Sequence, residues 1–223
     1  RRNMDGVIFD LDGTLLDSMG LWRKAGCIYL KKFGIDADES LADEILPLTI
    51  GGAAVYVKQK FGIPLPVDEI KDGINGVMEE GYKNFIPAKD GAEEFLAALY
   101  SRNIPMAVAT ATDRYLVKSA FERFGWNKYF TGIFTCSEVG VGKRDGADVY
   151  IAAMKSFSGT ISDSWVFEDP PHAALTAHNA GFLVAGVKDE GGKGDQQALK
   201  AASTVYVESL APADKVLKLI GVE

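Results

Sequence analysis

The sequence predicts an α/β protein with a parallel β-sheet core and a helical segment inserted after the first strand. After residue 87, short apolar runs alternate with helix-like segments, which is typical of repeated β-α units in a Rossmann-like sheet covered on both faces. Directly after the first apolar run, residues 17–86 show helical periodicity instead. We therefore expect residues 1–16 and 87–223 to form the core domain and residues 17–86 to form a helical cap domain.

The inserted segment has the pattern of four helices, and the glycine- and proline-containing stretch 62–66 interrupts it. These helices are expected at residues 17–34, 38–46, 50–61 and about 67–85. Because the segment follows the first strand, it would lie over the carboxyl ends of the sheet, where it can act as a lid.

The remaining strands and helices of the predicted core alternate along the chain. Strands are expected at residues 104–110, 133–136, 164–167, 182–187 and 204–207. Helices are expected at residues 90–102, 113–125, 145–157, 171–180, 196–202 and 212–220.

The amino-acid composition limits the kinds of molecule that the protein is expected to bind. The net charge of the 223 residues is −7 and no basic stripe is present, which argues against nucleic acid or an anionic membrane as a partner. No apolar run approaches the length of a membrane span, and the start of the sequence is too short before Asp10 for a signal peptide.

Cys27 and Cys136 have no metal-ligand spacing and are expected to be core thiols, which fits a reducing cytoplasm. We expect a cytoplasmic monomer or weak dimer.

The first apolar run, Val7-Ile8-Phe9, ends on two acids, Asp10 and Asp12. Ligands bind at the carboxyl ends of strands in open α/β sheets, and a buried carboxylate there is costly unless something neutralises it. Such a pair can hold a cation, or one acid can attack a substrate while the other moves protons.

Two other predicted strands also end in polar residues. Thr110, or as a second choice Thr112, offers a hydroxyl that can hold a phosphoryl oxygen. Glu168 and Asp169 follow another apolar run, and Mg²⁺ prefers hard oxygen ligands of this kind. The two histidines, His172 and His178, do not share a helix face, so a zinc site is not expected.

The string D-L-D-G-T-L-L-D-S at residues 10–18 resembles the first motif of the haloacid dehalogenase-like hydrolase superfamily, in its phosphatase and phosphomutase branch. The resemblance implies that Asp10 attacks phosphorus and becomes an aspartyl phosphate. It implies that Asp12 is first the general acid and then the general base, and that Thr110 binds the phosphoryl group. It also implies a lysine that offsets negative charge, for which Lys143 is the candidate and Arg144 the alternative.

The same resemblance implies a Mg²⁺ site. Its ligands would be Asp10, the main-chain carbonyl of Asp12, and Asp169, with Glu168 bound directly or through water. Pro170, Pro171 and His172 stand where the family often has a small polar residue and a glycine.

The leading hypothesis is a Mg²⁺-dependent phosphatase acting on a small phosphorylated metabolite, such as a sugar phosphate. The alternative is a sugar phosphomutase of the β-phosphoglucomutase type. Trp22 stands where the family's mutases have a histidine, and residues 49–54 contain no arginine, which favours the phosphatase. Asp12 and the Glu168-Asp169 pair speak against a dehalogenase, and the intact acids speak against a non-catalytic binding protein.

Overall fold

The structure is a computed structural model and describes residues 4–223. Its core is a six-stranded sheet in the order β3-β2-β1-β4-β5-β6, and every neighbouring pair is parallel. The strands are β1 (Gly6–Phe9), β2 (Met106–Thr110), β3 (Ile133–Thr135), β4 (Ser164–Glu168), β5 (Leu183–Val187) and β6 (Val205–Val207). The predicted α/β, Rossmann-like fold class is therefore confirmed.

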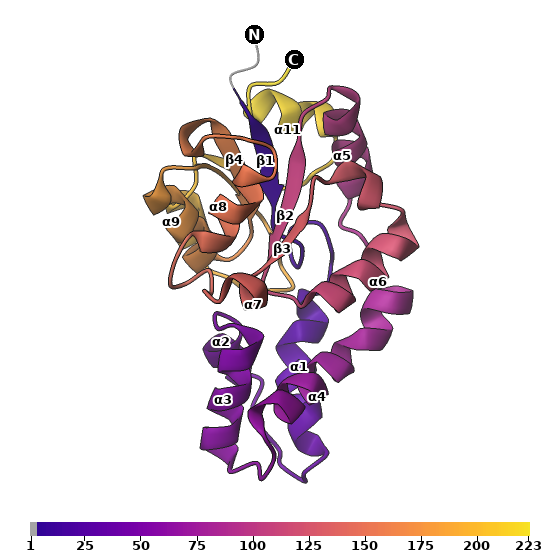
Figure 1. The fold of residues 1–223 in the computed structure, drawn as a ribbon, viewed down its shortest axis with the longest axis vertical. Coiled ribbons are helices and arrows are strands. Elements are labelled where there is room, and N and C mark those ends of the chain that lie inside the picture. The colour runs from indigo at the N-terminus through magenta and orange to yellow at the C-terminus, as the bar shows by residue number, and fades with distance from the viewer. Residues whose placement is uncertain (1–3) are drawn as a thin grey trace.

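Helices cover both faces of the sheet, as Figure 1 shows. The alternating side chains of β1 divide the core: Val7 and Phe9 belong to one cluster of buried residues, and Ile8 belongs to another on the opposite face. The core helices are α5 (Ala92–Ser101), α6 (Arg114–Phe124), α7 (Cys136–Val139), α8 (Asp148–Lys155), α9 (Pro171–Ala180), α10 (Gln196–Ala201) and α11 (Ala213–Leu219).

The segment after β1 is helical and lies at the end of the molecule opposite the two termini (Figure 1). It contains α1 (Met19–Lys31), α2 (Leu41–Ile45), α3 (Ile50–Phe61) and α4 (Val67–Glu80), followed by the π-helical turn η1 (Gly81–Phe85). Its two connections to the sheet lie side by side, because Leu16 and Ala88 form an antiparallel bridge and the amide of Asp17 donates to the carbonyl of Pro87 at 2.9 Å. The division into a core and a cap domain stays a prediction.

Most element boundaries differ from the sequence prediction by one to three residues. Two differences concern the type of element instead of its boundary. Cys136 begins the unpredicted helix α7, because the Thr135 hydroxyl accepts the amide of Glu138 and caps that helix. The predicted helix 67–85 is α-helical only to Glu80, after which it widens into the π-helical turn.

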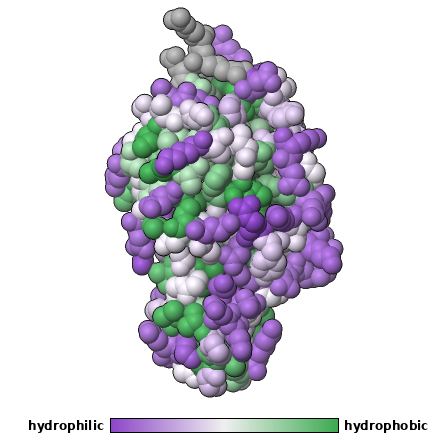
Figure 2. All heavy atoms as spheres, viewed as in Figure 1, coloured by the Kyte–Doolittle hydropathy of each residue, from purple (hydrophilic) through white to green (hydrophobic). Residues whose placement is uncertain are grey.

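The surface seen in Figure 2 mixes hydrophilic and hydrophobic residues and narrows toward the inserted helices. Within residues 4–223, no helix combines the length and the apolar character that a membrane span requires. Cys136 is buried as expected, whereas Cys27 is only half-buried, and neither forms a disulfide. The core-thiol prediction therefore holds fully for Cys136 alone.

The packing of Phe95 against Phe9 in the core leads to a prediction about stability. Phe95 of α5 is fully buried and packs edge-on against Phe9, with ring centroids 6.0 Å apart. Phe95→Ala should lower the free energy of unfolding by about 3–5 kcal/mol, because it leaves a cavity in a well-packed core. Phe85→Ala, at a ring that is 59% exposed, should change it by less than about 0.5 kcal/mol. Urea denaturation followed by circular dichroism measures both, and equal losses would contradict this account of the core.

Candidate active site

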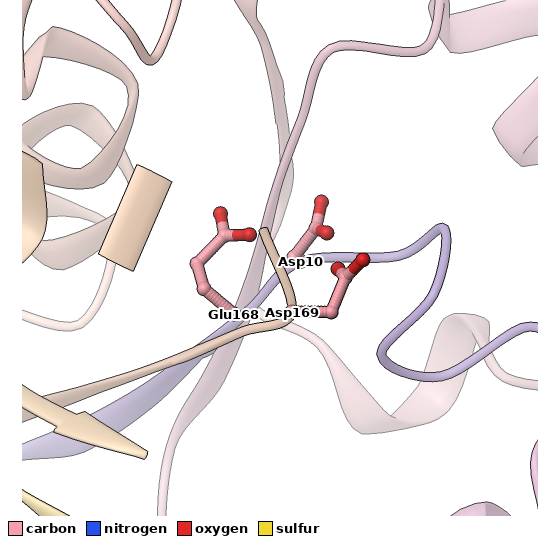
Figure 3. Close-up of side chains that lie close together, drawn as sticks. All are labelled: Asp10, Glu168 and Asp169. Atoms are coloured by element: carbon pink, nitrogen blue, oxygen red, sulfur yellow. The ribbon is translucent and has the colours of Figure 1, made fainter. Parts of the chain in front are cut away.

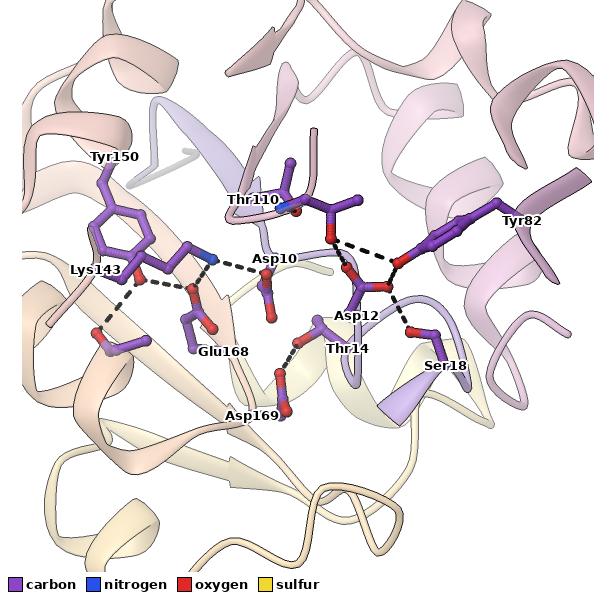
Figure 4. A network of polar contacts seen from close by, with 12 residues as sticks. Asp10, Asp12, Thr14, Ser18, Tyr82, Thr110, Lys143, Tyr150, Glu168 and Asp169 are labelled. Carbon is purple, nitrogen blue, oxygen red and sulfur yellow. Dashed lines mark hydrogen bonds and ion pairs between the residues drawn. The ribbon is translucent and has the colours of Figure 1, made fainter. Parts of the chain in front are cut away.

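Asp10 follows the central strand β1 and still pairs with the sheet, because its amide donates to the carbonyl of Phe167 at 3.0 Å. Its carboxylate accepts a hydrogen bond of 2.7 Å from the ammonium of Lys143, which also donates to Glu168 (Figure 4). The hydroxyl of Tyr150 donates to the same Glu168 oxygen at 2.6 Å. Burial alone would lower the pKa of Lys143, but the charges of Asp10 and Glu168 raise it, so this lysine stays charged.

Three buried carboxylates, of Asp10, Glu168 and Asp169, meet at the carboxyl ends of β1 and β4. Oxygens of the three lie within 4.8 Å of one another, and Figure 3 shows them side by side. Burial, with the charge of Asp10, raises the pKa of Glu168 to about 8 and that of Asp169 well above its usual value. The Glu168 oxygen Oε2 is buried and has no hydrogen-bond partner among the described residues. This set of hard oxygens, one of them unsatisfied, fits a divalent cation such as Mg²⁺.

The turn after the first strand requires glycine at position 13. Gly13 has φ +84°, and a Cβ there would lie 2.2 Å from an oxygen of Asp169. Thr14 donates to the other Asp169 oxygen at 3.1 Å, and Lys89 donates to the Gly13 carbonyl at 2.9 Å. The turn separates the two acids of the motif, so Asp10 faces Lys143 while Asp12 points elsewhere (Figure 4).

Asp12 is held by three hydroxyl groups. Ser18 and Tyr82 donate to its oxygen Oδ1, and Thr112 donates to Oδ2 (Figure 4). Burial raises the pKa of Asp12, and the negative charge of Asp10 adds to this rise. The three hydrogen bonds act in the opposite direction without cancelling it. A carboxyl group in this environment is suited to holding and releasing a proton.

Tyr82 connects this acid to the inserted helices. It belongs to the π-helical turn, its side chain is fully buried, and its hydroxyl accepts a 2.7 Å hydrogen bond from the indole of Trp22 in α1. The two aromatic rings meet edge to face. The inserted segment therefore contacts Asp12 directly.

The structure places most of the predicted residues together. The two residues of each alternative, Lys143 or Arg144 and Thr110 or Thr112, have different surroundings. Lys143 lies among the acids, whereas Arg144 is exposed and faces Asp145. Thr112 contacts Asp12 and lines the cavity described below. Thr110 is fully buried, and its hydroxyl accepts the amide of Thr112 at 3.0 Å. The catalytic roles of these residues stay predictions.

A cavity of about 270 Å³ lies beside these acids, between the inserted helices and the sheet. Trp22 and His172 both line it. Burial and the nearby charge of Lys143 lower the pKa of His172 to about 4, so its ring is neutral near pH 7.

Sequence reasoning missed three side chains that hold the site: Tyr82, Lys89 and Tyr150. Lys89 bonds the carbonyls of Gly13 and Lys188 and pairs with Asp189 at 3.0 Å. Each lies far along the chain from its partners and outside any motif, so a single sequence offers no signal for them.

Comparison with known proteins identifies the family. The sequence matches the haloacid dehalogenase-like hydrolases over residues 7–187. The chain belongs to this family. The predicted superfamily and the prediction of a hydrolase are thereby confirmed.

Several known proteins resemble the chain over most of its length. It is 28% identical over 213 residues to the validoxylamine A 7'-phosphate phosphatase of Streptomyces hygroscopicus subsp. limoneus, covering 95% of this chain and 92% of that one. It is 27% identical over 182 residues to the bifunctional riboflavin kinase/FMN phosphatase of Arabidopsis thaliana, covering 81% of this chain and 48%, about half, of the longer relative. Its fold resembles the crystal structure of β-phosphoglucomutase from Clostridium difficile, with a TM-score of 0.80, 17% identity and 97% of each chain covered.

The three crowded carboxylates predict how a metal should change stability with pH. Because the pKa of Glu168 is raised from 4.5 to about 8, the metal-free folded state holds this proton more tightly than the unfolded chain does. Stability in EDTA should therefore fall as pH rises from 5 to 8. Mg²⁺ binds the ionised carboxylates, so the rise in Tm that it causes should be larger at pH 8 than at pH 5.

Thermal unfolding with EDTA or Mg²⁺ at the two pH values measures this difference. Asp169→Asn should lose most of the Mg²⁺-dependent rise in Tm. A rise of equal size at both pH values, or one unchanged by the substitution, would contradict a cation site at these acids.

Proposed function

We propose that the protein is a Mg²⁺-dependent phosphatase that hydrolyses a small phosphorylated metabolite, such as a sugar phosphate, through an aspartyl-phosphate intermediate. The main support is the contact of Asp10 with Lys143 at the edge of a cavity that also exposes Asp12. The similarity to two phosphatases supports the same reaction class.

In this proposal Asp10 attacks phosphorus in line with the leaving oxygen. The ammonium of Lys143 lies 2.7 Å from the Asp10 carboxylate and offsets negative charge on the phosphoryl group. Phosphoryl transfer depends mostly on such positioning and electrostatic stabilisation. Thr110 ends the neighbouring strand β2 and Thr112 follows it, at a place where a hydroxyl and main-chain amides can hold phosphoryl oxygens.

Asp12 protonates the departing alkoxide and then takes a proton from the water that hydrolyses the aspartyl phosphate. Its raised pKa, caused first by burial, supports the first role. Glu168 and Asp169, together with Asp10 and the Asp12 carbonyl, would hold Mg²⁺, which when bound supplies positive charge to the phosphoryl oxygens. Residues 17–86 would form the cap that covers the cavity and selects the substrate.

Replacement of the nucleophile tests the proposal. Purified protein with Mg²⁺ and a panel of phosphorylated sugars and small acids should release phosphate. Asp10→Asn should lower the rate at least about a thousandfold, because an amide cannot form the acyl phosphate. Asp90→Asn, at an exposed acid, should retain the wild-type rate. Near-normal turnover by Asp10→Asn would refute the mechanism, and an isomerised sugar phosphate in place of free phosphate would identify the phosphomutase.

The contact of Tyr82 with Asp12 leads to a second prediction. If Tyr82 acts through Asp12, its loss should matter most for substrates with poor leaving groups, because these depend most on proton donation. Tyr82→Phe should lower kcat/KM about tenfold for an alkyl phosphate and less than about twofold for p-nitrophenyl phosphate, whose leaving group needs little protonation. Tyr115→Phe is a matched control, since its ring is 46% exposed and its hydroxyl contacts Glu79 instead. Equal losses for both substrates would mean that Tyr82 does not act through Asp12.

A further inference from the structure

Arg23 of α1 is a buried cation in the wall of the candidate active-site cavity. Its side chain is 8% exposed, and it lines the same cavity as Asp10, Asp12 and Lys143. Burial of a guanidinium away from water is costly unless acceptors satisfy it. The surroundings of Arg23 therefore indicate what the cavity is built to bind.

The hydrogen bonds of Arg23 are incomplete. Nη1 donates to Asp43 at 3.0 Å and, at 3.4 Å, to the carbonyl of Gly192. Nε is buried and has no acceptor among the described residues. The Asp43 side chain is 69% exposed, so this ion pair is weak and another acceptor can compete for the guanidinium. Arg23 thus has donors to offer to a ligand.

The rest of the wall formed by the inserted helices offers little polar chemistry. Among the described residues 17–86 that line the cavity, Arg23 and Asp43 are the only charged ones. The indole N–H of Trp22 is already donated to Tyr82. Most of the others are apolar: Met19, Trp22, Ala25, Ala42, Ile45, Leu46, Pro47, Leu48, Ile50, Ala53 and Ile74.

This wall favours one kind of substrate. An organic group with many hydroxyls would leave several of them unpaired against apolar side chains, which is unfavourable. A short apolar chain ending in an oxyanion would instead place its charge on Arg23. Lys143 cannot serve this second group, because Asp10 and Glu168 already engage it, and the neutral ring of His172 offers no charge. Lys193 also lines the cavity, but its side chain is 63% exposed and pairs with Glu39, so Arg23 is the buried cation that remains.

We propose that Arg23 determines specificity by binding an oxyanion, a carboxylate or a second phosphate, on the organic part of the substrate. The preferred substrates are then small phosphate monoesters with a short, largely apolar organic part and one additional anionic group. The cavity of about 270 Å³ can hold small molecules of this kind. This inference rests on the proposed phosphatase function and narrows its substrate class to esters less hydroxylated than a sugar phosphate.

Matched esters test the proposal in the wild-type enzyme. Alkyl phosphates of two to four carbons are compared with esters of the same length that end in a carboxylate, and with the corresponding bisphosphates. At least one anionic ester should have a kcat/KM about 10- to 100-fold above its neutral partner, the effect of a hydrogen-bonded charge pair. Comparison of the carboxylates with the bisphosphates identifies which oxyanion Arg23 binds.

Variants then assign the preference to the residue. Arg23→Gln should reduce the preference to about one, mainly through KM, and change kcat/KM for the neutral ester less than about threefold. Arg23→Lys should restore part of the preference, and Asp43→Asn should increase it by removing the competing carboxylate. Lys24→Gln, the same charge change at the exposed neighbouring residue, should leave both esters unaffected.

The outcomes separate this inference from the proposed function. Hydrolysis of neutral esters as fast as that of anionic ones would overturn the role of Arg23 and leave the phosphatase intact. Equal losses for both esters in Arg23→Gln would show a structural role only. If no ester of the whole panel is hydrolysed, the proposed function fails and this inference fails with it. If Arg23→Gln does not fold, the wild-type preference and the effects of Arg23→Lys and Asp43→Asn decide.

Discussion

The ion pairs of Lys143 with two buried carboxylates are the constraint around which this site is built. Parallel pairing sets Phe9 of β1 beside Phe167 of β4. The next residues, Asp10 and Glu168, therefore lie next to each other, and both are buried. One lysine pairs with two of the three carboxylates, and Asp169 takes part in no ion pair among the described residues. The register of the sheet therefore brings acidic groups together at the carboxyl ends of β1 and β4, and neighbouring groups have to offset their charge.

The turn at Gly13 gives the two acids of the first motif different surroundings. Asp10 meets an ammonium group, whereas Asp12 meets only hydroxyl donors from Ser18, Tyr82 and Thr112. Two carboxyl groups two residues apart thus have different partners, which is how one site can use one acid as a nucleophile and the other as a proton carrier.

The sequence predicted the parts that depend on local pattern. The apolar run before Asp10 identified the central strand, and the acids at the end of β4 identified the cluster that Figure 3 shows. It could not identify Tyr82 or Arg23, because their contacts depend on how helices pack on the sheet. It also could not locate the π-helical turn, since the one extra residue in that turn is set by tertiary packing and leaves no periodicity in so short a stretch.

The bridge between Leu16 and Ala88 brings the two ends of the inserted segment together at one point beside the sheet. An insertion whose ends are adjacent places no strain on its host, so its length and sequence can change while strand order and register stay the same. The acids on the sheet and the residues that contact the organic group of the substrate are thus free to diverge at different rates. Under the proposed function, exchange of the stretch between these two residues is the simplest route by which this scaffold would acquire a new substrate.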